Sequence, residues 1–349
     1  MVRLGFTGTG LIAWAHALGL RAMIESGVID AELAVVHDRS EQRARSFADM
    51  CGASVVSSAE EVAAACDAMW VCTPTAAHRA AVEAAVEAGI AVFCEKPLAT
   101  DLAGAETLVD AVAAAGIRAQ CGLVLRSAPV FRTLRELVAS GSLGRPMTAI
   151  FRDDQYFPIR GTYGSTWRSD VEQAGGGCLI EHSIHDVDIL RYCFGEAAQV
   201  SCRTANFAGF EGIEDLACVS VHFAQGCEAS LTSVWHNIMS RGSTRRIEVF
   251  CEEGTIWLSN EFRGPLRIQT SEHTESRECP SPAWVDALPL DDGEVGLAVR
   301  AYAEENRAFV DAVVNGTDPD PGLDEALVAH RLVDAAYRSA ATGGVPVTP

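Results

Sequence analysis

The sequence predicts an α/β domain with a doubly wound parallel sheet, followed by an α+β domain with an antiparallel sheet. Strand-like and helix-like runs alternate over the first 120 residues, which is typical of a parallel sheet with helical crossovers. From Pro146 to about Ile268 most runs are strand-like and are separated by hairpin signals. At 349 residues the chain is also too long for one ordinary core.

In the first half, short apolar runs alternate with segments of helical spacing. The expected strands are residues 2–7, 33–37, 53–56, 68–72, 91–94 and 118–122. The expected helices are residues 11–26, 41–50, 77–88 and 102–115.

In the second half, residues 215–223 and 227–235 flank Ala224-Gln225-Gly226, and residues 246–251 and 255–258 flank Glu252-Glu253-Gly254. Both are hairpin patterns. Helices are expected at 179–192, 297–315 and 324–341, and residues 271–295 read as an irregular acidic excursion at the surface. The predicted domains are an α/β domain at residues 1–122 and an α+β domain at residues 123–349. We expect the C-terminal helix to pack back toward the first domain.

Composition narrows the class of protein. The net charge of −20 argues against a nucleic-acid partner, whose binding needs a basic face. No run of eighteen apolar residues occurs, so no membrane span is expected. The first residues lack a signal-peptide pattern. The twelve cysteines contain no C-x-x-C pair and most lie in apolar runs, which predicts reduced thiols, no structural metal and a cytoplasmic location.

A glycine-rich turn follows the first predicted strand and opens the first helix. It reads Gly8-Thr9-Gly10-Leu11-Ile12-Ala13, which is G-x-G-x-x-A. The first glycine permits the tight turn, the second lets the main chain approach a pyrophosphate, and the small last residue allows close packing of helix and strand. The helix N-terminus at Leu11 and Ile12 would offer free N–H groups to the phosphates.

Asp38 ends the second predicted strand, where an acid can bind both hydroxyls of the adenosine ribose and repel a 2′-phosphate. This favours NAD over NADP. Arg39 and Ser40 leave NADP possible, because they could hold a phosphate. Asp38 or Ser40 could equally be a helix N-cap.

Cys94-Glu95-Lys96-Pro97-Leu98 closes a strand-like apolar run. A lysine at the end of a buried strand is badly placed for packing, but burial lets a lysine exchange protons near neutral pH. A polar loop after a strand is the other interpretation.

Gly175-Gly176-Gly177 precedes a helix in which Glu181, His185 and Asp188 are spaced i, i+4, i+7 and would share one face. A carboxylate one turn away can orient a histidine, which is the natural acid–base for an alcohol. An ordinary helix-surface pair remains an alternative. A metal site at His182, His185, Asp186 and Asp188 is disfavoured, because the two histidines differ in facing from Asp186 and no cysteine or third histidine completes a tetrahedral set.

Taken together, these motifs resemble those of the Gfo/Idh/MocA family of oxidoreductases, over nearly the whole chain. Glu95-Lys96-Pro97 matches the family hallmark. The other resemblances are the Thr73-Pro74 to His78 segment, Gly141-x-x-Gly144-Arg145-Pro146, the segment from Gly175 to Asp188, and the last helix around Tyr337.

The resemblance implies a Rossmann domain, then a domain with a large open sheet that makes homodimer or homotetramer contacts. It implies hydride transfer between NAD and a CH–OH carbon of a sugar, cyclitol or similar polyol. Lys96 would bind the substrate hydroxyl and His185 would remove its proton. Glu181 stands where the family often has aspartate. The remaining implied contacts are to the cofactor, from Thr73, Pro74, His78, Glu95, Lys96 and Arg126, and to the substrate, from Trp167, Arg168 and His182.

Two other functions fit the same pattern. One is an NAD-assisted glycoside hydrolase or lyase, in which the nicotinamide oxidises a sugar carbon transiently and is then restored. The other is a nucleotide-sensing regulator without catalysis, against which the presence of both Lys96 and His185 argues.

Overall fold

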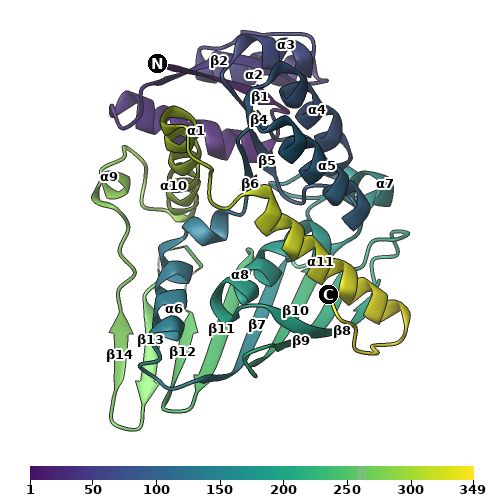
Figure 1. Cartoon of the computed structure of the whole chain (residues 1–349), viewed down its shortest axis with the longest axis vertical. Coiled ribbons are helices and arrows are strands. Elements are labelled where there is room, and N and C mark those ends of the chain that lie inside the picture. Colours follow the sequence, from purple (N-terminus) through teal and green to yellow (C-terminus); the bar gives the residue numbers. More distant parts are fainter. Residues whose placement is uncertain (259–260, 263) are drawn as a thin grey trace. The chain divides into compact units, whose positions relative to one another are not determined.

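The computed structural model describes residues 1–258, 261–262 and 264–349, and these form two compact units (Figure 1). The first unit contains residues 1–124 and 281–327, and the second contains 125–280 and 328–349. The sequence-based boundary at 122/123 falls beside the first crossing of the chain between units. The return of residues 281–327 to the first unit was not predicted.

The first unit contains a parallel sheet with strand order β3-β2-β1-β4-β5-β6. Its strands are β1 (Val2–Thr7), β2 (Ala31–His37), β3 (Ser54–Val55), β4 (Ala68–Val71), β5 (Ala91–Glu95) and β6 (Ala119–Gly122). Its helices include α1 (Leu11–Glu25), α2 (Glu41–Cys51), α3 (Ala59–Ala65), α4 (His78–Ala88), α5 (Leu102–Ala115), α9 (Ala283–Asp286) and α10 (Glu294–Asn315).

The strand order reverses between β1 and β4, because β2 and β3 lie on one side of β1 while β5 and β6 lie beyond β4. In doubly wound sheets this switch point, at the carboxyl ends of the strands, is where ligands bind. Gly8 directly follows β1, and Lys96 directly follows β5. The predicted doubly wound α/β domain is therefore confirmed, and both residues follow strands of its parallel sheet.

The second unit contains a mostly antiparallel sheet with strand order β14-β13-β12-β11-β7-β10-β9-β8, in which β7 and β10 run parallel. Its strands are β7 (Pro146–Tyr156), β8 (Ala197–Ala205), β9 (Leu216–Phe223), β10 (Glu228–His236), β11 (Thr244–Cys251), β12 (Gly254–Leu258), β13 (Leu266–Thr270) and β14 (Thr274–Arg277). Both predicted hairpins are present. The α+β prediction with a large open sheet is confirmed.

One face of this sheet is buried and the other is open. Along β9, Ala217, Val219 and Val221 are buried while Ser220 and His222 are exposed, which is the alternation expected of a half-covered strand. The buried face packs with α6 (Pro129–Ser140) and α8 (Ile184–Phe194) in one hydrophobic core, which α11 (Leu323–Ala341) also joins.

Two sequence predictions were wrong in detail. Residues 271–295 are not simply an acidic surface loop, because they contain β14 and α9 and bury Val285 and Leu288 completely or nearly so. Helices α3 and α6 were not predicted, although α6 begins at a proline and buries Val130, Phe131 and Leu134 with helical spacing.

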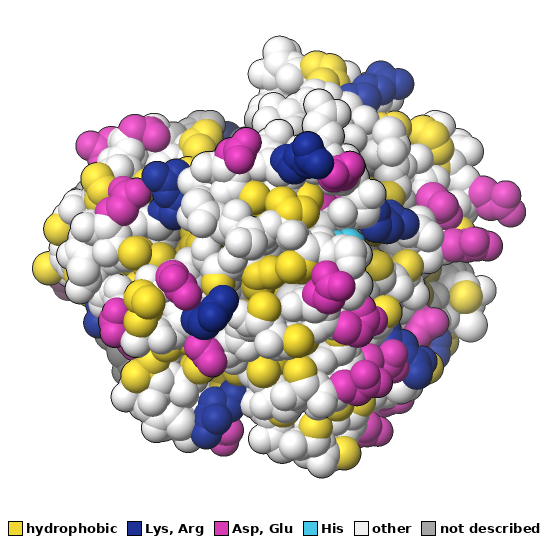
Figure 2. Space-filling view, turned by 90° about the horizontal axis from the view of Figure 1, so that it is seen from above, with side chains coloured by type: hydrophobic (Ala, Val, Ile, Leu, Met, Phe, Trp, Pro, Cys, Tyr) yellow, Lys and Arg dark blue, Asp and Glu magenta, His cyan; other side chains and the backbone are white. Residues whose placement is uncertain are grey.

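The described residues contain no helix that is long and apolar enough to cross a membrane. The twelve cysteines are free thiols, and ten of them are buried, as most were predicted to be. Among the described residues on the face shown in Figure 2, acidic and basic side chains are interspersed, with hydrophobic side chains between them.

Candidate active site

The glycine loop after β1 has the geometry that a dinucleotide requires. Gly8 has φ +85°, and a Cβ there would lie 2.6 Å from the carbonyl of Cys72, so a side chain is excluded. At Gly10, by contrast, a Cβ would meet nothing within 4 Å among the described residues. Gly10 caps α1 through an extended backbone and without a side-chain hydrogen bond. The start of α1 therefore faces open space, with its N–H groups available to a phosphate.

Asp38 ties the end of β2 to this loop. Its carboxylate accepts hydrogen bonds from the main chain and hydroxyl of Thr9 at 2.9 and 3.0 Å, and from Ser40 N at 2.7 Å. Arg43 donates to it as well, at 2.8 Å. Burial alone would raise the pKa of Asp38, but the hydrogen bonds from Arg43, Ser40 and Thr9 lower it below its usual value. The N-cap of α2 is Ser40, so Asp38 is the charged group beside the loop.

The segment after β4 reaches the same edge of the sheet. The ring of His78 is buried and its Nε2 lies 3.0 Å from the carbonyl oxygen of Thr73. Burial lowers the pKa of His78, which keeps the ring neutral at physiological pH. The hydroxyl of Thr73 is buried and makes no hydrogen bond to any described residue, so a polar ligand group at the loop would satisfy it.

Lys96 emerges from β5 beside a buried acid. Glu95 is 5% exposed, and its Oε2 accepts a hydrogen bond from the main-chain N–H of Lys96 at 3.2 Å. A Cβ at Gly122 would lie 2.5 Å from Glu95 Oε1, so this carboxylate packs directly against the main chain of β6. Lys96 is also the one lysine in the sequence, and the other 26 of the 27 basic residues are arginines.

The predicted helix 179–192 is interrupted in the structure. Residues Cys178–His182 form a π-helical turn, Ser183 follows, and α8 begins at Ile184. Glu181 and His185 therefore do not belong to one continuous α-helix, which corrects the i, i+4, i+7 prediction. His185 is buried in the first turn of α8.

Glu214 explains the interruption. Its carboxylate accepts hydrogen bonds from Gly177 N at 2.7 Å, from Leu179 N at 2.9 Å and from the Tyr337 hydroxyl at 2.9 Å. A Cβ at Gly177 would lie 1.8 Å from the carbonyl oxygen of Glu214, so glycine is required there. Burial raises the pKa of Glu214. The main chain at the glycine run thus binds a carboxylate of this chain.

Three predicted site residues, Arg168, Glu181 and Arg126, form ion pairs in the second unit. Arg168 donates to Glu181 at 2.6 Å and stacks over the ring of Trp167 at 4.6 Å. Arg126 donates to both oxygens of Asp188, at 2.8 and 2.6 Å. The predicted Trp167–Arg168 pair is therefore one structural group with Glu181.

His182 joins a charged cluster at the centre of the buried sheet face. Arg245 Nη2 lies 3.0 Å from His182 Nε2, and Arg245 Nε donates to Asp186 at 2.7 Å. Asp153 lies opposite Arg245 in the register of β7 and β11, and Ser183 donates to Asp153 at 2.8 Å. Burial raises the pKa of Asp186 well above its usual value, whereas Arg245 and His182 outweigh burial and lower that of Asp153.

These contacts include residues that the sequence analysis missed, among them Asp153, Glu214 and Arg245. Isolated acidic and basic residues in strand-like runs gave no signal of their own, because their partners come from distant segments. The predicted Asp186 and Asp188 of the alternative metal site face arginines instead. Among described residues no group of three or more metal-ligating side chains occurs.

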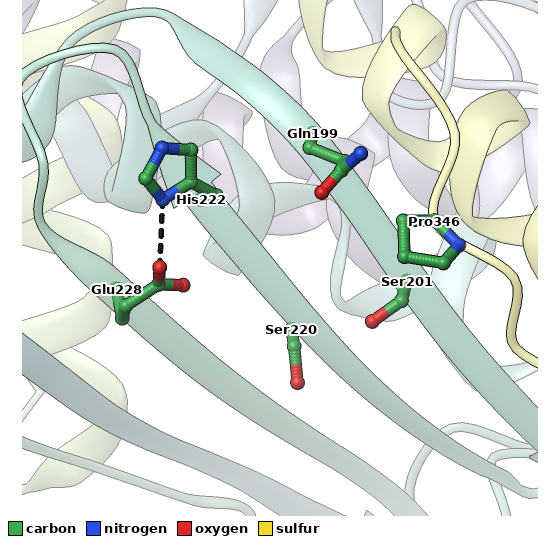
Figure 3. Close-up of a pocket in the computed structure, with 6 residues that line it drawn as sticks. All are labelled: Gln199, Ser201, Ser220, His222, Glu228 and Pro346. Carbon is green, nitrogen blue, oxygen red and sulfur yellow. Dashed lines mark hydrogen bonds and ion pairs between the residues drawn. The ribbon is translucent and has the colours of Figure 1, made fainter.

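A shallow polar pocket of about 260 Å³ lies elsewhere, on the open face of the second sheet (Figure 3). It is lined by Gln199, Ser201, Ser220, His222, Glu228 and Pro346, and Glu228 lies 2.6 Å from His222 Nδ1. The residues that line it include none of the predicted site residues. We therefore do not assign it to the candidate active site.

A switch-point glycine loop, an acid at the end of β2 and a lysine after β5 define a dinucleotide-dependent oxidoreductase. Two family models match the chain. One is the oxidoreductase family with an NAD-binding Rossmann fold, over residues 2–123, and the other is the GFO/IDH/MocA C-terminal domain, over residues 131–257. The chain belongs to the GFO/IDH/MocA family of oxidoreductases, and it is an NAD-binding enzyme.

Relatives match along the whole chain. An inositol 2-dehydrogenase of Cereibacter sphaeroides (strain ATCC 17029) is 30% identical over 355 residues, covering 99% of this chain and 97% of the relative. A 1,5-anhydro-D-fructose reductase of Ensifer adhaerens is 28% identical and covers 98% and 97%. The structure of a levoglucosan dehydrogenase in complex with NADH and levoglucosan has a TM-score of 0.85 at 21% identity, covering 99% of each chain. The structure of its complex with NADH has a TM-score of 0.84.

The residues of the first unit fit NAD. Gly8 permits the tight turn, and Gly10 leaves space beside the start of α1. The buried hydroxyl of Thr73 has no hydrogen-bond partner among the described residues. Gly10, Leu11 and Ile12 would meet the pyrophosphate, and Asp38 the adenosine ribose. Arg39 is exposed next to Asp38.

Proposed function

We propose that this protein oxidises a CH–OH group of a sugar, cyclitol or related polyol, with NAD as the hydride acceptor, and that Lys96 and His185 handle the hydroxyl proton. The reaction turns CH–OH into C=O. The hydrogen on carbon leaves with its electron pair to the bound nicotinamide, and the hydroxyl proton leaves to a base of the protein. A positioned base contributes about 10²–10⁴ in rate to such a step.

The observation that carries this proposal is the choice of lysine at position 96. The chain uses arginine at every other basic position, and arginine cannot give up its proton in a protein. A lysine differs because it can exchange a proton when its surroundings favour the neutral amine. The one lysine lies directly after β5, at the carboxyl edge of the sheet that also carries Gly8 and Thr73.

In the second unit, we propose His185 as the acid–base. Glu181, which accepts a hydrogen bond from Arg168, would help to orient that histidine. Trp167, Arg168 and His182 are proposed substrate contacts. Arg168 lies over the indole of Trp167, and that pair offers guanidinium donors next to an apolar surface, which suits a polyol.

The substrate class is supported by the relatives, two of which act on an inositol and on 1,5-anhydro-D-fructose according to their names. A polyol ring is common to both. The proposal is kept at that class, because these two relatives are 30% and 28% identical to the chain.

The experiment is a screen of sugars, cyclitols and glycosides with NAD and, separately, NADP, read by the absorbance of the reduced cofactor. The first hit is then measured in Lys96→Arg and His185→Asn. Each variant should lose about 10²–10⁴ in kcat/KM while NADH affinity changes by no more than a few-fold. Arg79→Lys, the reverse exchange on the exposed side of α4, is the matched control.

Wild-type rates in both Lys96→Arg and His185→Asn would refute the assignment of the proton transfer. Absence of reduced cofactor with every polyol, alongside cleavage of a glycoside, would refute net oxidation.

We also propose a cytoplasmic homo-oligomer that pairs through the open face of the second sheet. Ile150 on β7 is 49% exposed on that face, and Phe250 and Trp257 on the neighbouring strands are partly exposed. Light scattering after gel filtration tests this, and Ile150→Glu should favour the monomer. A wild-type monomer would contradict it.

A further inference from the structure

A buried hydrogen-bonded network in the first unit connects α1, β5 and α10. His16 is fully buried, with Nε2 2.8 Å from Glu95 Oε1 and Nδ1 2.7 Å from Asn306 Oδ1. Asn306 is also fully buried, and Trp70 Nε1 lies 2.9 Å from the same Oδ1. The sequence analysis assigned no role to His16.

The direction of each hydrogen bond follows from the donors. An indole N–H can only donate, so the Asn306 atom that faces Trp70 must be the amide oxygen. The amide nitrogen of Asn306 then donates to the carbonyl oxygen of His16 at 3.2 Å, which fits the same orientation. His16 Nδ1 faces that amide oxygen, so Nδ1 must carry a hydrogen.

A neutral His16 beside an ionised Glu95 would lack one proton at the contact between them. With its hydrogen on Nδ1, a neutral His16 has a lone pair on Nε2, and that lone pair would face a carboxylate oxygen at 2.8 Å. Two acceptors do not approach to that distance in a buried site, because neither would be satisfied. A further proton between Nε2 and Oε1 resolves the contact, whether it resides on His16 or on Glu95.

We propose that His16 is a positioning residue, which shares one buried proton with Glu95. The His16–Glu95 pair, whose acid ends β5 directly before Lys96, then carries no net charge. Trp70 and Asn306 keep the proton in that contact, because they fix the other side of the imidazole. The second oxygen of Glu95 remains free to accept the main-chain N–H of Lys96. Glu95 therefore accepts the main-chain N–H of Lys96 while the His16–Glu95 pair carries no net charge.

Several further titratable groups of the first unit interact with Glu95 by charge. Among the described residues of the first unit they include His78, Cys72, Cys94 and Glu305, besides His16. Burial lowers the pKa of His78 and raises those of both thiols, so all three are neutral at pH 7.

Glu305 is fully buried, and neither of its carboxyl oxygens has a hydrogen-bond partner among described residues. Burial raises its pKa well above the usual value, so it is protonated. The rings of Phe93 and Tyr302 contact His16 edge-on at 4.9 and 5.0 Å and exclude water from the imidazole.

Two substitutions preserve the hydrogen bonds but differ in charge. In His16→Gln, the amide N–H can still donate to Glu95, but no proton is shared and Glu95 becomes a full carboxylate. In Glu95→Gln, the amide N–H can donate to Nε2 of a neutral His16, so the pair is neutral without the extra proton. The chain has one lysine, so protein labelled with ¹³C at the lysine ε-carbon gives one lysine signal whose pH titration reports on Lys96.

We expect His16→Gln to shift the Lys96 titration upward, on the order of one pH unit, because an uncompensated carboxylate favours the charged amine. Glu95→Gln should leave the titration close to that of the wild type. If Glu95 were instead an uncompensated carboxylate in the wild type, the pattern would reverse. Glu95→Gln would then shift the titration downward and His16→Gln would leave it unchanged, and either result would overturn the proposal.

A second measurement does not depend on the substitutions. In protein labelled with ¹⁵N-histidine, His16 should show a hydrogen on Nδ1 and a protonated or proton-sharing Nε2 at pH 7. An unprotonated Nδ1 would also overturn the proposal. The inference rests on the proposed function only for the use of Lys96 in proton transfer. Neither measurement needs a substrate, so failure of the polyol screen and failure of this inference are distinguishable.

Discussion

Breaking the Arg126–Asp188 ion pair should destabilise α8 more than the loss of a surface pair could. The side chain of Arg126 is 9% exposed and that of Asp188 is 1% exposed, and two hydrogen bonds of 2.8 and 2.6 Å join them. In Asp188→Asn, the amide oxygen can accept one of these bonds, but the amide N–H₂ then faces the second guanidinium donor. An arginine charge is left buried without its counter-charge.

The expected cost is about 3–5 kcal/mol, the range for removing one partner from a buried ion pair. Hydrogen exchange of α8 amides measures it locally, which avoids assuming that the two units unfold together. That free energy corresponds to exchange about 10²–10⁴ times faster in α8. The exposed pair Arg338–Asp334 supplies the control, since Asp334→Asn should cost at most about 1 kcal/mol.

The double variant Arg126→Gln/Asp188→Asn separates the pair from its surroundings. Its loss of stability should be smaller than the summed losses of the two single variants by at least about 1 kcal/mol, because the second substitution removes the charge whose ion pair the first one broke. Additive effects, or α8 exchange in Asp188→Asn at the wild-type rate, would refute this reasoning.

Three further outcomes are expected. Glu305→Gln should become more stable relative to the wild type as pH rises from about 4.5, by up to about 1.4 kcal/mol per pH unit. The reason is that Glu305 keeps its proton in the folded wild type and loses it in the unfolded chain. Denaturation midpoints that change in parallel for both proteins between pH 5 and 8 would contradict this. Gly8→Ala should weaken NADH binding by at least about tenfold in a fluorescence titration, since its Cβ would lie 2.6 Å from Cys72, and unchanged affinity would be evidence against the loop as the phosphate site. Asp38→Asn should raise NADPH affinity relative to NADH by about tenfold, because it removes a negative charge and releases Arg43, and an unchanged ratio would argue against the ribose contact.

Local patterns were sufficient to predict most of the sheet of the first unit and its glycine loop. The glycine loop, the acid at Asp38 and the strand that ends before Lys96 each depend on residues close in sequence, and β1 was predicted to the residue. The return of residues 281–327 depends instead on the packing of α10 against α1, where Ala303 lies against Gly19. Small residues on two distant helices carry no pairing signal in one sequence.

The second unit shows the same limit at its site. The sequence identified Glu181 and His185, but it assumed a continuous helix, because i, i+4 spacing is the same in any helical pattern. What interrupts the helix is Glu214, which lies more than thirty residues away and reaches the main chain at Gly177 and Leu179. Hydrogen bonds that main-chain N–H groups donate to a distant carboxylate have no counterpart in local periodicity.

The late return of α10 has a consequence during protein synthesis. Phe309 packs with Trp70 and Phe93 at ring distances of 5.1 and 5.7 Å, so the aromatic core of the first unit stays incomplete until the ribosome has passed that residue. At about 5–20 residues per second, the nascent β-sheet waits roughly 10–40 s after Val124 for the helix that completes it. During that interval the chain exposes two large aromatic side chains, so its yield in cells should depend on chaperones that bind nascent chains.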